Sequence, residues 1–152
     1  MKKNIDINKK RALICVEKIF CSKAQNMRME KLNDVQKLFQ FFHDMKAENE
    51  NFFSDYQVDG EKTIKNIFWA NASCRAAYAD LGDCIMFDTT YQSNTYHMPL
   101  VVFVGVNNHL QSTIFGVALM GDESEESFDW VFATLLKCML GKQPICILTG
   151  AL

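Results

Sequence analysis

The residue types that could support metal-dependent chemistry in this sequence are a few carboxylates, of which Asp88 is the most informative. Asp88 follows four apolar residues at 84–87 and precedes two threonines and a tyrosine at 89–91. This pattern predicts a buried strand with a carboxylate near its end. An ionised carboxylate there is costly unless it is paired, hydrogen-bonded or metal-bound. Asp88 is therefore interpreted as a catalytic ligand, the remnant of one, or a structural hydrogen-bond acceptor.

A second group of carboxylates begins with Asp122 and Glu123 and directly precedes a predicted helix. Negative charge is favourable at a helix amino terminus, where Ser124 or Ser127 would supply the cap. The alternative hypothesis places Asp122 or Glu123 close to Asp88. Helix capping is the preferred interpretation.

Histidine and tyrosine side chains give weaker signals. His97 and His109 lie in predicted turns without partners at metal-ligand spacing, so both are interpreted as solvated surface residues. Tyr91 and Tyr96, on or beside the polar turn after Asp88, could stack on a nucleic-acid strand, although hydrophobic packing is the preferred interpretation.

The bulk composition indicates one ordinary globular domain. The chain has 152 residues and a net charge of −2, which gives no overall attraction to nucleic acid. Residues 1–30 are expected to be a basic, poorly defined segment. Six cysteines without C-x-x-C or zinc spacing indicate reduced thiols and an intracellular protein. No signal peptide is recognisable, and the longest apolar run, 99–106, is too short to span a bilayer.

Apolar periodicity predicts the elements that must position these side chains. In order they are a helix at 31–48, or a slightly shorter one capped by Asn33 or Asp34, a hairpin at 52–69 turning at 59–60, a helix at 72–81, strands at 83–90, 99–107 and 112–120, a helix at 127–140 and a strand at 145–149. Residues 23–30 have a loop-like pattern. The last strand should lie parallel to the strand at 83–90, reached by a helical crossover. The expected fold class is an α/β (α+β) mixed sheet that opens a ribonuclease-H-like fold.

In that topology, carboxylates on the first strand, at the end of the fourth and on a later helix hold two divalent metals. Asp88 is correctly placed for the first position. Gly150 follows the fourth strand, and a third acid would lie beyond Leu152. An acid triad is therefore not expected within this chain.

Several separate motifs carry a family resemblance: residues 66–70, 87–91, 98–107, 115–116 and 122–130. Through them the chain resembles, over 31–149, the plant far-red-impaired-response proteins, which derive from Mutator-like (MULE) transposases. The resemblance implies a ribonuclease-H-like transposase core retained in nuclear, DNA-associated transcription regulators. It implies that Asp88 is the vestigial first acid and metal ligand, and that an aspartate normally stands where this chain has Gly150. The family's amino-terminal zinc-type domain and carboxy-terminal SWIM zinc finger have no matching ligands here.

These observations predict a truncated MULE transposase-like domain at 31–152 in a non-catalytic nuclear protein linked to regulation of DNA-templated transcription. The alternatives are a metal-dependent DNA transposase or nuclease and a non-functional truncated product. No cofactor is expected, with Mg²⁺ or Mn²⁺ only in the catalytic alternative. Protein partners and self-association through exposed apolar strands are expected, with indirect or weak DNA contact, no membrane and no small-molecule substrate.

Overall fold

The computed structural model describes residues 27–61, 63–91 and 98–149. The expected basic segment lies almost entirely outside these residues, as do Tyr96, His97 and Gly150. Within the described residues, no helix is long and apolar enough to cross a membrane.

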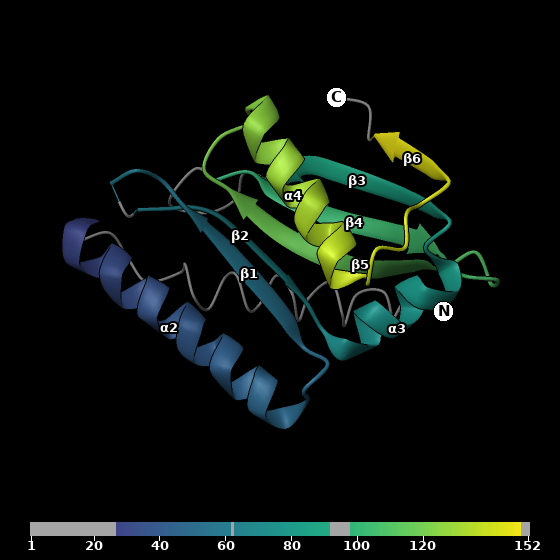
Figure 1. Ribbon diagram of the computed structural model, residues 1–152, viewed down its shortest axis with the longest axis horizontal. Coiled ribbons are helices and arrows are strands. Elements are labelled where there is room, and N and C mark those ends of the chain that lie inside the picture. The colour runs from purple at the N-terminus through teal and green to yellow at the C-terminus, as the bar shows by residue number, and fades with distance from the viewer. Residues whose placement is uncertain (1–26, 62, 92–97, 150–152) are drawn as a thin grey trace.

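A single mixed sheet forms the centre of the molecule (Figure 1), with six strands in the order β1-β2-β5-β4-β3-β6. The strands are β1 (Phe53–Val58), β2 (Ile64–Ala70), β3 (Cys84–Tyr91), β4 (Leu100–Val106), β5 (Ser112–Met120) and β6 (Cys146–Thr149). Only the β3–β6 pair is parallel, and the other neighbours are antiparallel. The predicted mixed sheet and the parallel return of the last strand are therefore confirmed.

The amino-terminal hairpin belongs to this same sheet. Its second strand, β2, pairs with β5 in a register that places Asn66 opposite Met120 and Trp69 opposite Val117. The hairpin itself was predicted from the step Asp59-Gly60, but its attachment to β5 was not. That attachment widens the four-stranded core to six strands.

Three helices flank the sheet in the described residues: α2 (Met27–Glu48), α3 (Ala72–Leu81) and α4 (Glu125–Cys138). The predicted start of the first helix was wrong, because α2 already begins at Met27 and neither Asn33 nor Asp34 caps it. Residues 27–31 were interpreted partly as loop because they are polar. They nevertheless consist of strong helix formers, without proline or glycine to stop the helix.

The two faces of the sheet carry separate cores because side chains alternate along each strand. Phe68 and Phe103 face α3 and α4, and the ring of Phe103 lies 5.6 Å from that of Phe132 on α4. Trp69, the next residue along β2, belongs to the other core and lies 5.7 Å from Phe42 on α2. Figure 1 shows α4 crossing the sheet and α2 running beside β1.

Candidate functional site

Asp88 lies where the β3–β6 ladder ends. The last pair of that ladder joins Phe87 to Thr149, and these residues immediately precede Asp88 and Gly150 in the sequence. On its other side, Asp88 pairs with Val102 of β4, and its side chain is half-buried. The prediction that this carboxylate lies on a sheet strand is confirmed, but its predicted position near the end of the strand was wrong. Asp88 lies in the middle of β3, because the strand continues through the β-branched Thr89 and Thr90 to Tyr91.

Strand alternation determines which face of the sheet Asp88 occupies. The ring of Phe87 lies 5.2 Å from Phe132 and 6.2 Å from Phe128, so Phe87 faces α4. Asp88 must then face the opposite side, where its partner Val102 belongs to the core on the α2 side. The carboxylate therefore lies on the side of the sheet away from α4.

Asp122 is engaged at the start of α4. Its Oδ1 accepts hydrogen bonds from the Ser124 backbone N–H at 3.1 Å and from the Ser127 hydroxyl at 2.6 Å. The hydrogen bonds from Ser124, and then from Ser127, lower the pKa of Asp122 to about 2. Ser124 caps the helix by accepting from the Ser127 backbone N–H. The helix-capping interpretation is confirmed.

The structure does not bring Asp122 and Asp88 together. Asp122 forms an ion pair with Lys65, which precedes Asn66 in β2, and the Lys65 Nζ lies 4.0 Å from the Asp122 Oδ2. Between β2 and β3 lie β5 and β4, a separation of three inter-strand spacings of about 4.8 Å each. Glu123 is exposed to solvent.

A two-metal site needs several carboxylates at one point. Within residues 27–61, 63–91 and 98–149, no group of three or more His, Cys, Asp or Glu side chains could hold a metal ion. The donors around Asp88 in this part of the chain therefore do not fit a pair of divalent cations.

Asn66 is a key residue that sequence reasoning did not single out. It is fully buried, and its Nδ2 donates to Gln57 Oε1 at 2.7 Å and to Ser127 Oγ at 3.3 Å. Its Oδ1 accepts from the Gly121 backbone N–H at 3.1 Å. Asn66 thus joins β2 to the loop between β5 and α4. The sequence signal for this role was an amide side chain within the apolar run at 64–70, because a buried amide needs hydrogen-bond partners.

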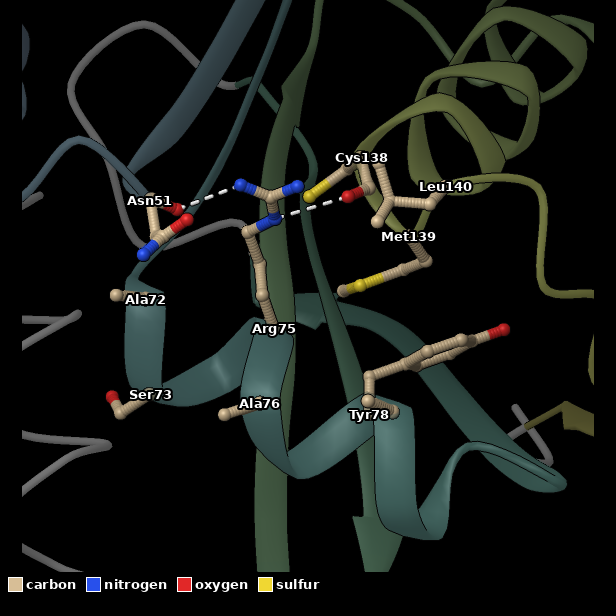
Figure 2. Close-up of a pocket in the computed structure, with 10 residues that line it drawn as sticks. Asn51, Ala72, Ser73, Arg75, Ala76, Tyr78, Cys138, Met139 and Leu140 are labelled. Carbon is tan, nitrogen blue, oxygen red and sulfur yellow. Dashed lines mark hydrogen bonds between the residues drawn. The ribbon is translucent and has the colours of Figure 1, made fainter.

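A hollow of about 530 Å³ lies between α3 and the carboxyl end of α4 (Figure 2). Arg75 crosses it, donating through Nε to the Cys138 carbonyl at 3.0 Å and through Nη1 to the Asn51 carbonyl at 2.9 Å. Burial raises the pKa of the Cys138 thiol to about 12. The guanidinium is committed to two carbonyl groups and the thiol stays protonated, so the hollow is a structural junction.

Comparison with known proteins matches residues 84–151 to the MULE transposase domain. The protein FAR1-RELATED SEQUENCE 5 of Arabidopsis thaliana is 39% identical over 116 residues, which are 76% of this chain and 15% of the relative. The Arabidopsis thaliana protein FAR-RED IMPAIRED RESPONSE 1 is 40% identical over 116 residues, 76% of this chain and 14% of that protein. The chain belongs to the FAR1-related MULE family. No solved structure matches it significantly.

The match to the MULE domain begins at the first residue of β3 and contains β4, β5, α4 and β6. This FAR1-related chain is therefore transposase-derived, and the matched residues contain the strand, strand, strand, helix and strand series predicted as the ribonuclease-H-like core. Asp88 lies inside the match, whereas Asn66 and the hairpin precede it. The 116 residues aligned with these two relatives are only 15% and 14% of the relatives' own length.

Proposed function

We propose that this chain is part of a non-catalytic, transposase-derived nuclear protein that takes part in regulating DNA-templated transcription through protein contacts. In this proposal the chain needs neither zinc nor another cofactor. The chain contacts DNA only indirectly or weakly. The names of the relatives and the MULE match support the family part of the proposal.

The observation that carries the non-catalytic part is the register of β3 and β6. Thr149 pairs with Phe87, so the residues that follow them are Gly150 and Asp88. The family resemblance puts an aspartate where Gly150 stands, and glycine offers no carboxylate. A single acid cannot hold two hard cations and stabilise the attacking and leaving oxygens of a phosphodiester.

The catalytic alternative predicts nuclease activity that depends on Mg²⁺ or Mn²⁺. The test incubates the purified chain with supercoiled plasmid and labelled duplex DNA in each metal. We expect no metal-dependent cleavage, and the same result for Asp88→Asn. The matched control is Asp122→Asn, which changes an acid far from Asp88. Cleavage that Asp88→Asn abolishes and Asp122→Asn retains would establish an active site and contradict the proposal.

A second experiment tests the proposed role in transcription regulation. The chain is fused to a heterologous DNA-binding domain in plant cells that carry a reporter gene with the matching operator. We expect nuclear accumulation of the fusion and a change in reporter transcription relative to the DNA-binding domain alone. The control is a core variant, Phe103→Asp, which should lose the fold because Phe103 is fully buried. An unchanged reporter with a folded, nuclear fusion would reject the regulatory role.

A further inference from the structure

Two exposed thiols lie side by side at the edge of the sheet. Cys84 is the first residue of β3 and Cys146 the first of β6, and the parallel ladder pairs them directly. Paired residues of neighbouring strands lie about 4.8 Å apart, within the Cα separation of roughly 4.4–6.8 Å that a disulfide requires. The two sulfurs can therefore be joined without moving either strand far.

The backbone holds this pair in place. The Asp83 carbonyl, directly before Cys84, accepts from the backbone N–H of Ile145 at 2.7 Å and of Cys146 at 3.0 Å. These two hydrogen bonds fix the start of β6 against the start of β3.

The thiols already interact with each other. A hydrogen bond with Cys146 is the main cause that raises the pKa of Cys84 above its ordinary value. The two sulfurs therefore lie within hydrogen-bond reach of each other. Either sulfur can be the first nucleophile, and the other then resolves the intermediate.

The other two described cysteines offer a contrast. Cys138 is fully buried at the end of α4, and Cys74 is half-buried on α3. Burial is the main cause that raises the pKa of both thiols. Neither combines solvent access with a direct strand partner, so they provide an internal reference for reactivity.

We propose that Cys84 and Cys146 form a redox-active dithiol that a hydroperoxide oxidises to a disulfide linking β3 to β6. One of the two sulfurs attacks the terminal oxygen of the peroxide, the O–O bond breaks, and a sulfenic acid forms together with one molecule of alcohol, or of water where the oxidant is hydrogen peroxide. The other sulfur then attacks that sulfenic sulfur, the S–S bond forms, and the sulfenic oxygen leaves as water. The two thiols lose two electrons and two protons, and the hydroperoxide takes them up.

The disulfide would fasten the edge strand to the rest of the sheet. It closes a loop from residue 84 to residue 146, which restricts the unfolded chain. The cross-link forms at the opposite end of the β3–β6 ladder from Asp88, so it does not use the candidate acidic position. This inference stands independently of the function proposed above.

The test uses the full chain, reduced, freed of reductant and exposed to hydrogen peroxide. Trypsin cleavage after lysine and arginine places each described cysteine in a separate peptide: Cys74 in 66–75, Cys84 in 76–137, Cys138 in 138–142 and Cys146 in 143–152. We expect mass spectrometry without reductant to find peptide 76–137 linked to 143–152, in a chain that remains monomeric on a denaturing non-reducing gel. Reductant should separate the two peptides.

Matched variants complete the experiment. Cys84→Ser and Cys146→Ser should abolish the link, and Cys74→Ser should retain it. Oxidation should raise the melting temperature of the wild-type chain by roughly 5 °C and leave Cys84→Ser unchanged. A first-formed link between 66–75 and 138–142, a link between two copies of the chain, or irreversible oxidation of Cys146 without a link would each overturn the proposal.

Discussion

At the scale of single residues, short polar side chains hold the corner between β5 and α4. Asp122 accepts hydrogen bonds from Ser124 and Ser127, and Ser127 is also reached by the buried amide of Asn66. The capping role of Asp122 could be predicted, because an acid before a serine and a helix is a local pattern. The role of Asn66 could not, since Gly121 and Ser127 lie more than fifty residues further along the chain.

The depressed pKa of Asp122 predicts a specific response to acid. Its pKa is about 2 in the folded chain, against an ordinary value of 3.8. A carboxyl with a depressed folded pKa contributes stability above its ordinary value and loses that contribution as the pH falls toward the folded value. Asp122→Ala should therefore destabilise the chain by about 1 kcal/mol at pH 7, through its lost hydrogen bonds, and by less as the pH approaches 2.

Urea unfolding at a series of pH values checks this prediction. Glu123→Ala is the control, because Glu123 is an exposed neighbouring acid. If Asp122→Ala and Glu123→Ala show the same pH dependence, the capping hydrogen bonds of Asp122 do not contribute to stability.

At the scale of elements, β4 and β5 are held together by close packing beneath α3. A Cβ atom added to Gly105 of β4 would lie 2.2 Å from two ring atoms of Phe115 on β5. Phe115 is fully buried, and its ring lies 5.1 Å from that of Tyr78 on α3. The ring therefore has no room to retreat from a side chain at position 105.

Gly105→Ala should destabilise the chain by about 1–3 kcal/mol through overpacking. The control is Gly60→Ala, because a Cβ there would have no atom within 4 Å; it should change stability by less than about 0.5 kcal/mol. Thermal or chemical unfolding measures both. Equal stability of Gly105→Ala and the wild type would show that Phe115 can reorient.

Sequence patterns predicted the individual strands but not all of their pairings. Every strand from 53 to 149 was predicted, because each apolar run is bounded by turn residues such as Asp59-Gly60. The pairing of β2 with β5 was not predicted. Alternation with a period of two indicates which face of a strand is buried, but it does not indicate which other strand pairs with it. The same limit applies to the candidate site. The presence of Asp88 on a sheet strand follows from local sequence, whereas its separation from Asp122 depends on the strand order.

At the scale of the whole molecule, the sheet presents an apolar edge at β6. All four residues of this strand are exposed, and Ile147 and Leu148 are 46% and 49% exposed. Ile145, just before the strand, is 85% exposed. An exposed edge strand with apolar side chains can pair with a second chain.

We expect the chain to self-associate in a concentration-dependent way, and Ile147→Lys to shift it toward monomer. Val106→Lys is the matched control, because Val106 is 48% exposed but lies at the end of the interior strand β4. Sedimentation velocity under reducing conditions measures the distribution and excludes disulfide-linked species. A wild-type chain that stays monomeric, or equal effects of the two lysine variants, would contradict the prediction.

The attachment of the hairpin to β5 has a consequence for where this fold can be divided. The recognisable transposase segment starts at residue 84, yet β5 shares its ladder with β2, and Ser127 and Gly121 share Asn66. Arg75 likewise connects the end of α4 to the segment after α2. A piece cut at residue 84 would expose Val117 and Leu119, which are buried beside β2 and α2. It would also remove the hydrogen bond from Asn66 to the buried Ser127 hydroxyl. The segment that matches the MULE domain model is therefore shorter than the unit that folds, which begins well before residue 84.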